Sequence, residues 1–412
     1  MKIAVLGAGI SGLGSAYILS QKHQVDVYEK DNRLGGHART TILEEDGKSF
    51  GVDTGFLVFN YATYPLLTKL FEKLEVKIEN SDMSFGFWDK DKNVAYNGDS
   101  IGGMFFQKRN LFNLVHYKMI KDVLSFNEKA NSDLYHNSKD LDLSLGEYIK
   151  NFGTAFKQRY ILPMGGAIWS TPTDEMNAFP ARTFITFFKN HGLLGVNTHH
   201  QWLTVSNGSI NYVNKIKEKI NGNIYLNSDV ISVQRVENGV NLVHENGNKT
   251  FYDKVVFAMH APDALKLIEK PTLQEVEILS AFKYKENKAV LHNDNSILYP
   301  NKKIYAAWNY TTSKENKNAV SLTYWINTLQ NLKTRKDYFV TLNEPNNINK
   351  KIEDITYEHP QFTSLAIKSQ KRKDEICGQN NCYFAGAYWR YGFHEDGLHS
   401  ANELAKKLGC EL

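Results

Sequence analysis

The chain has 412 residues, of which 42% are hydrophobic and 12% aromatic, so it has enough apolar side chains for a large core and is not a disordered protein. Its 49 basic and 45 acidic residues leave a formal net charge of +4, which is too balanced to indicate a nucleic-acid-binding protein. The small basic excess is compatible with an acidic substrate or an anionic membrane surface but requires neither.

A strand, a glycine-rich turn and a helix are predicted at the start of the chain. Residues 2–6 form a short apolar run typical of a buried parallel strand, and three glycines follow it in the spacing GxGxxG. The first glycine of this motif permits a tight turn, the second lets the backbone approach a pyrophosphate, and the third lets the helix pack close to the strand. The free N–H groups of the helix N-terminus favour phosphate. We predict a dinucleotide site formed here by Gly7, Gly9, Ile10, Ser11 and Gly12.

A second strand is predicted over residues 24–28, and Glu29 follows it directly. Glu29 lies 17 residues after Gly12, which is about where an acidic residue meets the ribose hydroxyls of a bound dinucleotide. An acid at this position disfavours a 2′-phosphate, so NADP is a poor fit. A glycine-rich turn without a ligand is the weaker alternative, because strand, glycines, helix and acid all have the expected order.

The residues after Glu29 resemble a known family. Arg33, Gly35 and Gly36 form an RxGG sequence with basic neighbours, which is similar to an extension found in the flavin-containing amine oxidase and phytoene desaturase superfamily. Residues 52–55 resemble the segment of that family that approaches the flavin, and NAD-dependent dehydrogenases lack the extension. The resemblance therefore implies FAD, held noncovalently because the cysteine that carries the flavin in monoamine oxidases has no clear match. The residues implied are Lys30, Gly35, Gly36, His37, Ala38, Thr54, Gly55 and Phe56.

Residues 64–74 have the spacing of an amphipathic helix, whereas residues 101–126, rich in Phe, Met and Lys, leave two interpretations open. The favoured one is a pair of core helices. The other is peripheral membrane contact through residues 101–120, with aromatic rings in the bilayer and cations at the head groups. The side chains concerned are Phe105, Phe106, Phe112, Lys108, Arg109 and Lys118.

Aromatic side chains concentrate in residues 160–190 and predict an apolar wall. Trp169 and Phe184 are the candidates there for a substrate pocket, and ordinary core packing is the alternative. Further along, strands predicted at 223–226, at 230–233 and within 240–259 resemble the second part of the family's FAD domain. In that family a strand valine, here Val230, holds the adenine through its backbone, and Ala258 is expected to contact the cofactor as well.

Three further strands are predicted at 289–292, 304–310 and 321–325, beside a substrate cavity, while Pro345, Pro360 and the polar run 343–351 are predicted to be loop. His292 is the first candidate for a catalytic base, because the pKa range of histidine suits proton transfer, although a structural histidine is commoner in a strand. Lys288 is its rival, since amine oxidases of the superfamily hold a lysine near flavin N5 through a water molecule. Aromatic side chains expected around the reacting carbon are Tyr391, Trp308 and Tyr388.

The C-terminal segment resembles the last motif of the family, a strand ending in Ala-Gly and then a helix whose N-terminus faces the flavin. The family usually has an acidic residue after Ala-Gly, but Ala387 stands there in this chain. One hydrogen bond to the cofactor must therefore come from backbone or water. The cofactor-binding residues that this motif implies are Gly386, Ala387, Glu395, Asp396, Gly397 and Leu398.

These elements predict the α/β fold class with α+β features: a Rossmann-like FAD-binding domain of the amine oxidase and glutathione reductase type, interleaved with a substrate domain of mixed sheet and helices. The FAD-binding domain is predicted to be discontinuous and to comprise residues 1–60, 196–264 and 372–412. The substrate-binding domain comprises residues 61–195 and 265–371.

Finer features narrow the resemblance, among them residues 55–60, 166–170, 308–310 and 391–397. They are similar to bacterial FAD-dependent oxidoreductases related to the N-terminal half of plant cyclopropane fatty acid synthases, and to desaturases of methyl-branched acyl chains in furan fatty acid synthesis. The resemblance implies desaturation of a lipid acyl chain, such as that of a methyl-branched phospholipid, by hydride transfer to flavin N5.

Three alternatives to this activity stay open. One is a flavin amine oxidase that releases hydrogen peroxide, and another is an FAD-dependent fatty acid double-bond isomerase. A binding module beside a methyltransferase is less favoured, because the predicted pocket residues are many.

The three cysteines, Cys377, Cys382 and Cys410, have no nearby histidine pair, so reduced thiols and no metal site are predicted. The N-terminal residues run directly into the glycine motif and do not form a cleavable signal peptide. The sequence has no apolar run of about 18 residues, so no membrane span is predicted. We expect a cytoplasmic protein without nucleic-acid partners. Contact with the inner face of the membrane and oligomer formation are left open.

Overall fold

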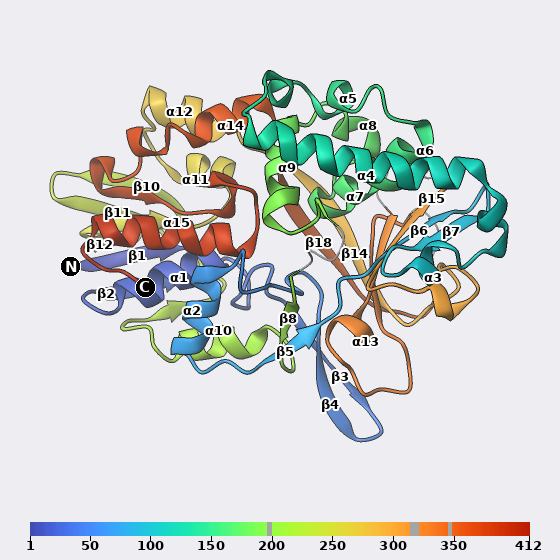
Figure 1. The fold of residues 1–412 in the computed structure, drawn as a ribbon. Coiled ribbons are helices and arrows are strands. Elements are labelled where there is room, and N and C mark those ends of the chain that lie inside the picture. The colour runs from blue at the N-terminus through green and yellow to red at the C-terminus, as the bar shows by residue number, and fades with distance from the viewer. Residues whose placement is uncertain (196–199, 314–320, 345–347) are drawn as a thin grey trace.

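The sheet that begins at the N-terminus has five parallel strands in the order β19-β13-β1-β2-β9 (Figure 1). It is seen in a computed structural model that describes residues 1–195, 200–313, 321–344 and 348–412. The central strands are buried along nearly their whole length, which is why they have continuous apolar sequences. The five strands are β1 (Lys2–Leu6), β2 (Gln24–Tyr28), β9 (Ile224–Tyr225), β13 (Lys254–Phe257) and β19 (Cys382–Phe384).

Helices α1 (Ile10–Leu19), α10 (Ile210–Lys217) and α15 (His394–Lys407) pack together beside this sheet. The five-stranded sheet and these helices form one lobe of the molecule. The same lobe contains a second, antiparallel sheet, together with three short helices that lie near it (Figure 1). Its strands are β10 (Val230–Val236), β11 (Gly239–His244) and β12 (Lys249–Tyr252), and the helices are α11 (Ala261–Leu267), α12 (Leu273–Ser280) and α14 (Ser364–Gln370).

The other lobe is built on a seven-stranded sheet in the order β18-β14-β17-β16-β15-β6-β7. Its neighbours pair antiparallel except β15 and β6, which are parallel. The mixed sheet agrees with the predicted fold class. Its strands are β6 (Phe85–Asp89), β7 (Val94–Asn97), β14 (Lys283–His292), β15 (Trp308–Thr312), β16 (Ser321–Trp325), β17 (Phe339–Leu342) and β18 (Lys351–Gln361).

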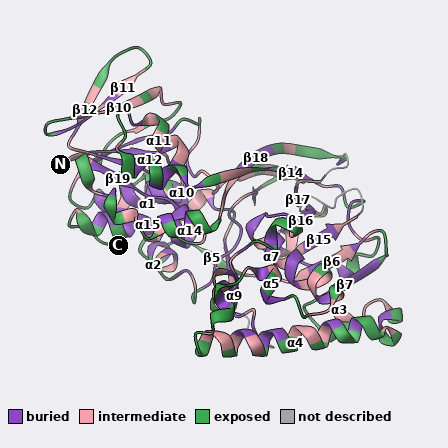
Figure 2. Ribbon diagram, turned by 90° about the horizontal axis from the view of Figure 1, so that it is seen from above, coloured by how far each residue is buried: buried purple, intermediate pink, exposed green. Residues whose placement is uncertain are grey.

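A group of helices covers one side of this sheet, and the long helix α4 runs along the outer edge of the molecule (Figure 2). The helices are α3 (Ile101–Met104), α4 (Leu114–Tyr135), α5 (Leu145–Tyr148), α6 (Thr154–Phe156), α7 (Leu162–Trp169), α8 (Thr173–Met176) and α9 (Ala181–Asn190). Helix α13 (Ile326–Leu329) follows β16 and lies apart from this group (Figure 1). No helix among the described residues combines the length and apolarity needed to cross a membrane.

Two small antiparallel pairs and one further helix complete the fold: β3 (Thr40–Glu45) with β4 (Lys48–Asp53), β5 (Ile78–Ser81) with β8 (Trp202–Val205), and α2 (Pro65–Lys73). Leu67, Leu70 and Phe71 of α2 are buried, as the helical spacing predicted. They join the hydrophobic cluster of the parallel sheet, as do Ile278 and Leu279 of α12. Both helices thus pack with the first lobe, although the predicted boundaries assign them to the substrate domain.

Proline placement corrects one local prediction. Pro360 was expected in a loop, but it lies in β18, which is an edge strand of its sheet and, among the described residues, pairs with β14 alone. An edge strand tolerates proline because one side of its backbone needs no partner. Pro345 lies outside the described residues. The strand predicted at 304–310 begins only at Trp308, after a short 3₁₀ turn at Lys302–Ile304.

Candidate active site

A cavity of about 1800 Å³ extends from the glycine-rich turn to helices α4, α7 and α9. Small-molecule pockets usually measure roughly 300–1,000 Å³, so this cavity has room for more than one ligand. The predicted residues that line it are Gly7, Gly9, Ile10, Ser11, Glu29, Lys30, Gly36, His37, Gly55, Phe56, Trp169, Val230, Ala258, Trp308, Gly386, Ala387, Tyr388 and Tyr391.

The glycine turn has the geometry of a phosphate cradle. Gly7 has a φ of +100°, and a Cβ there would lie 2.6 Å from the carbonyl oxygen of Ala258. A Cβ on Gly12 would lie 1.9 Å from the carbonyl oxygen of Gly7, so strand and helix approach as closely as the motif requires. A Cβ on Gly9 would meet no atom within 4 Å, which leaves space in front of this backbone. Helix α1 has no side-chain cap, so its first N–H groups are available to an anion.

Glu29 fixes the other side of this end of the cavity. Its carboxylate accepts the N–H of Ala8 at 2.7 Å and the N–H of Asp31 at 3.0 Å. The side chain is 8% exposed and lines the cavity at the end of β2. These two hydrogen bonds fix the Glu29 carboxylate at the position where the sequence predicts contact with the ribose hydroxyls of a bound dinucleotide.

The RxGG segment completes the dinucleotide end. Gly35 and Gly36 have φ values of +107° and +56°, which other residues adopt rarely. The Arg33 guanidinium donates to the carbonyl oxygen of Gly36 at 2.8 Å, and Arg33 lines the cavity. Arg39, which forms an ion pair with Glu353, lines it as well. Neither arginine was among the predicted site residues, although two cations beside a pair of glycines indicate a phosphate-binding site.

Eight of the predicted cofactor-binding residues lie behind the cavity wall instead of on it: Gly12, Gly35, Ala38, Thr54, Glu395, Asp396, Gly397 and Leu398. Glu395 accepts the N–H groups of Leu66 and Leu67, each at 2.9 Å, and so caps helix α2. A Cβ on Gly397 would lie 2.7 Å from the Ser11 hydroxyl. The start of α15 therefore positions neighbouring elements, and of the helix itself only its first residue, His394, lines the cavity.

Asp396 gives a testable pH dependence. Its carboxylate accepts the N–H groups of Tyr391 at 3.2 Å and Phe393 at 3.0 Å, and burial raises its pKa from 3.8 to about 6. Because the folded state binds this proton more tightly than the unfolded state, the stabilisation is complete below pH 3.8 and is lost as the pH rises through 6. The Asp396→Asn variant keeps the acceptor and loses the titration. Between pH 5 and pH 8, the unfolding free energy of the unsubstituted protein should fall by about 1 kcal/mol relative to the variant.

Urea titration of both proteins at the two pH values measures this difference. A difference that stays constant with pH would contradict the burial of an ionisable carboxylate at this cap.

The far end of the cavity is aromatic and apolar. Trp169, Trp308, Tyr388 and Tyr391 line it, as predicted, but Phe184 does not. Phe184 is fully buried and stacks on Phe188 with ring centroids 4.2 Å apart, so it supports the wall from behind. Lining residues that were not predicted include Tyr160, Met164, Ile168, Phe187, His191, Tyr324 and Phe393.

The two predicted bases lie elsewhere. His292 is fully buried, and its Nε2 pairs with the Thr341 hydroxyl at 2.8 Å while its Nδ1 accepts the N–H of Asp294 at 3.1 Å. Both ring nitrogens are thus satisfied, and His292 does not line the cavity. Lys288 is exposed on β14 and does not line the cavity either. The structure therefore removes both residues from the candidates for a base.

His191 replaces His292 and Lys288 as the candidate base because of its position. It lines the cavity just after α9, and its Nδ1 lies 2.9 Å from the carbonyl oxygen of Phe187. A carbonyl can only accept, so Nδ1 carries the proton and Nε2 keeps its lone pair. The ring stacks on Phe187 with centroids 3.7 Å apart, and Phe393 lies 6.2 Å away. Burial lowers the pKa of His191 to about 4, so the ring is neutral at neutral pH.

A charged trio lies on the cavity wall near α11. His260, Asp263 and Glu358 bring one ligand atom each within 4.8 Å of one another, which is close enough for a metal ion. However, Nδ1 of His260 already lies 3.2 Å from the Glu358 carboxylate, and Nζ of Lys266 lies 2.9 Å from the Asp263 carboxylate. The Lys266 cation therefore neutralises the Asp263 carboxylate, while the Glu358 carboxylate lies beside the His260 ring.

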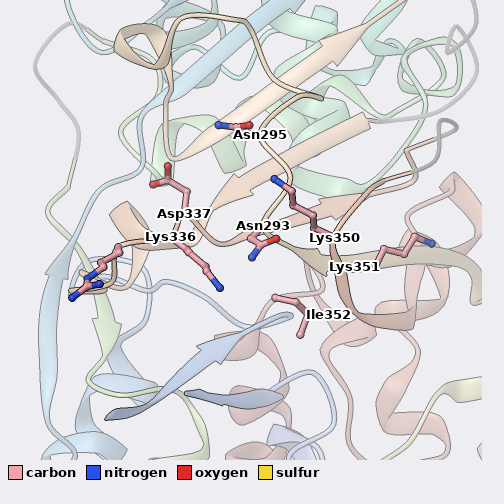
Figure 3. Close-up of a pocket in the computed structure, with 8 residues that line it drawn as sticks. Asn293, Asn295, Lys336, Asp337, Lys350, Lys351 and Ile352 are labelled. Atoms are coloured by element: carbon pink, nitrogen blue, oxygen red, sulfur yellow. The ribbon is translucent and has the colours of Figure 1, made fainter. Parts of the chain in front are cut away.

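A second hollow of about 650 Å³ is lined by other residues, among them Asn293, Asp337 and Lys350 (Figure 3). Three of its charged side chains form ion pairs: Asp337 pairs with Lys302 at 2.7 Å, Lys351 with Asp354 at 3.2 Å, and Arg335 with Asp46 at 2.9 Å. None of the predicted site residues lines it. We therefore locate the active site in the large cavity.

The family model for flavin containing amine oxidoreductases matches residues 10–297. A 4,4'-diapophytoene desaturase (4,4'-diaponeurosporene-forming) of Staphylococcus aureus strain MRSA252 is 34% identical over 95 residues, which are 22% of this chain and 18% of that protein. The match therefore spans less than a fifth of that relative.

Two solved structures share the whole fold. The CLA-producing fatty acid isomerase from P. acnes superposes with a TM-score of 0.69 at 14% identity, over 98% of each chain. Wild-type putrescine oxidase bound to putrescine superposes with a TM-score of 0.71 at 13% identity, over 99% of each chain. At such identities the likeness concerns the fold alone.

Proposed function

The chain belongs to the family of flavin containing amine oxidoreductases and is an FAD-dependent oxidoreductase, and on that premise we propose that it desaturates a lipid acyl chain, such as that of a methyl-branched phospholipid. The observation that carries this proposal is the wall formed by α4, α7 and α9. The side chains that these helices contribute are apolar or uncharged: Tyr117, Ile120, Val123, Leu124, Asn127, Met164, Ile168, Trp169 and Phe187. A long alkyl chain fits such a wall, whereas a cationic amine leaves its charge unpaired there.

The residues at the dinucleotide end fit FAD. The open space at Gly9, the uncapped α1 and the Arg33 guanidinium suit a pyrophosphate, and Glu29 suits the ribose of the adenosine half. FAD supplies the acceptor for a hydride from carbon. The protein then has to orient the chain, exclude water and accept the second hydrogen as a proton.

Tyr388 follows Ala387 and lines the cavity. Its hydroxyl is shielded from the cavity and meets no partner with hydrogen-bonding geometry among the described residues, although Trp389 lies next to it. The hydrogen bond that the family's acid supplies therefore has to come from backbone or water. A buried hydroxyl without a partner is costly, so we expect Tyr388→Phe to leave FAD affinity unchanged and the apoprotein at least as stable.

Equilibrium titration of the apoprotein with FAD, together with thermal unfolding of the apoprotein, measures both effects. A loss of FAD affinity in this variant would show that the Tyr388 hydroxyl contacts the cofactor.

His191 is the proposed base. The Phe187 carbonyl accepts a hydrogen bond from Nδ1, so Nε2 keeps its lone pair, and we propose that Nε2 faces the acyl chain from an otherwise apolar wall. In the proposed reaction one C–H bond breaks with its electron pair going to the flavin, and the neighbouring C–H bond breaks with its proton going to Nε2. The electrons of that second bond form the C=C bond. The flavin is reduced by two electrons and the acyl chain is oxidised by two.

Single-turnover product analysis tests this proposal. The purified holoenzyme is mixed without oxygen with a methyl-branched phospholipid in detergent micelles, and the acyl chains are analysed by mass spectrometry. We expect one chain lacking two hydrogens for each flavin reduced. A product of unchanged mass with a displaced double bond would favour an isomerase, and peroxide released from amines in air would favour an amine oxidase.

A further inference from the structure

The surface where α3 meets the start of α4 exposes an unusual group of apolar side chains. Exposure reaches 82% for Ile101, 90% for Phe112 and 84% for Leu114. Leu111 and Val115 are their direct neighbours in sequence and are about half exposed. We call these five residues the apolar ridge. Exposed apolar side chains that gather in one place mark an interaction surface more often than scattered ones do.

The ridge is held together as one rigid feature. The Phe105 ring lies 5.2 Å from the His116 ring and 5.4 Å from the Tyr117 ring, so the end of α3 packs on the first turns of α4. The Tyr117 hydroxyl donates to the carbonyl oxygen of Leu111 at 3.1 Å. Further along α4, Met119 and Phe126 are buried and anchor the helix to the core. The ridge therefore projects from a fixed base.

The charges around the ridge are mostly positive. Residues 99–121 contain four cations, Lys108, Arg109, Lys118 and Lys121, and one acid, Asp99, so this segment has a net charge of 4 − 1 = +3. All four cations are exposed. Apolar side chains flanked by lysine and arginine are the arrangement that suits the interface of an anionic membrane.

The large cavity reaches this surface. Ile101 belongs both to the ridge and to the cavity lining, and Met104, Phe105, Tyr117, Ile120 and Leu124 continue the lining inwards. Helix α4 lies along the outer edge of the molecule, with α3 near one of its ends (Figure 2). An alkyl chain can thus pass from a bilayer at the ridge into the cavity without crossing water.

We propose that the apolar ridge inserts into an anionic bilayer and that the acyl substrate passes from the bilayer into the cavity between α3 and α4. The passage of substrate rests on the function proposed above, whereas membrane binding itself does not. The core-helix interpretation of residues 101–126 holds for the buried side of α4, and the interfacial interpretation is extended here to its exposed N-terminal part.

Vesicle co-sedimentation tests the binding. The holoenzyme is mixed with vesicles of phosphatidylcholine containing phosphatidylglycerol, and with vesicles of phosphatidylcholine alone. We expect the Phe112→Ser/Leu114→Ser variant to lose at least tenfold in partitioning to the anionic vesicles. The matched control, Leu273→Ser/Leu365→Ser, removes two side chains that are 80% and 62% exposed on other helices, and it should bind like the unsubstituted protein.

The cations are tested separately. Lys108→Gln/Lys118→Gln should weaken binding to the anionic vesicles by about fivefold for each lysine and leave weak binding to phosphatidylcholine unchanged. Equal binding of all variants, or no binding of the unsubstituted protein at low salt, overturns the proposal. A dimer in solution that the Phe112→Ser/Leu114→Ser variant dissociates, without vesicle binding, also overturns it and assigns the ridge to a second copy of the chain.

Turnover measurements distinguish the proposed membrane site from the proposed function. Phe112 and Leu114 do not line the cavity, so the ridge variant should turn over a micellar lipid at the normal rate and a vesicle-embedded lipid at least tenfold more slowly. Vesicle binding without turnover of any lipid contradicts the proposed function and keeps the membrane site. Normal turnover of embedded lipid by the ridge variant contradicts the proposed passage of substrate.

Discussion

The Gly9→Asp variant is expected to fold without FAD. Gly9 is the N-cap of α1 and has an extended backbone with φ of −74°, which aspartate adopts readily. Space for the new side chain exists, because a Cβ at this position meets no atom within 4 Å. Aspartate is among the best N-cap residues, so its carboxylate would satisfy the first N–H groups of the helix itself. The helix gains a cap and loses its free anion site.

The same carboxylate repels a pyrophosphate. Two like charges about 4 Å apart near a protein surface repel with about 4 kcal/mol, which corresponds to roughly a thousandfold loss of FAD affinity. Titration of the apoprotein with FAD measures the loss, and thermal unfolding of the apoprotein should show equal or higher stability. Gly9→Asn is the matched control, because it competes for the same N–H groups without charge and should lose less affinity. FAD affinity like that of the unsubstituted protein in Gly9→Asp would contradict a phosphate site at this turn.

The His191→Phe variant is expected to reduce its flavin about 100- to 10,000-fold more slowly, which is the usual contribution of a positioned base. Phenylalanine keeps the stacking on Phe187 and removes both ring nitrogens. The Phe187 carbonyl stays paired, because it also accepts the backbone N–H of residue 191 at 3.0 Å. FAD affinity and thermal stability should therefore change little, and stopped-flow reduction by lipid under anaerobic conditions isolates the chemical effect.

His292→Gln is the control for this experiment. It breaks a buried hydrogen-bond pair and should cost about 1–3 kcal/mol of stability, while flavin reduction per bound FAD stays normal. The pH profile gives a second readout. The pKa of His191 is lowered to about 4, so His191 stays unprotonated down to about that pH. The reduction rate should therefore fall only near pH 4, and not near the ordinary histidine pKa of 6.5. A normal rate in His191→Phe would leave His191 as a stacking residue only.

The dinucleotide end of the site could be predicted from sequence because its constraints are local. A turn that needs positive φ at Gly7, Gly35 and Gly36 leaves its signature at those positions. The acid at Glu29 is marked by its distance from the same turn. These features depend on backbone sterics within a few residues, and the structure places each of them as the spacing indicates.

The base could not be predicted in the same way, because it depends on the tertiary arrangement. Strand alternation puts His292 on the face of Lys288, which is exposed. At His292 the same face is covered, because the ring of Phe339 on the paired strand β17 stacks on His292 with centroids 5.5 Å apart. His191 has no motif around it. Its one local signal is the position four residues after Phe187 at the end of a helix, where the two rings meet.

The far end of the cavity shows a further limit of sequence reasoning. The abundance of aromatic residues in 160–190 predicted an apolar wall, and Trp169 lines it. Phe184 has an equally apolar sequence context but faces Phe188 behind that wall. Both kinds of position require an apolar residue, so composition does not distinguish residues that line the cavity from residues that pack behind its wall.

Anaerobic reduction of the bound flavin by candidate substrates is the most direct test of the proposed desaturase. The holoenzyme is mixed in separate experiments with a methyl-branched phospholipid in micelles, with its straight-chain saturated counterpart, and with a polyamine such as putrescine. We predict that the visible absorbance of the oxidised flavin disappears with the branched lipid, in proportion to the unsaturated product formed, and persists with the polyamine. Bleaching by the polyamine and not by either lipid would contradict the proposed function.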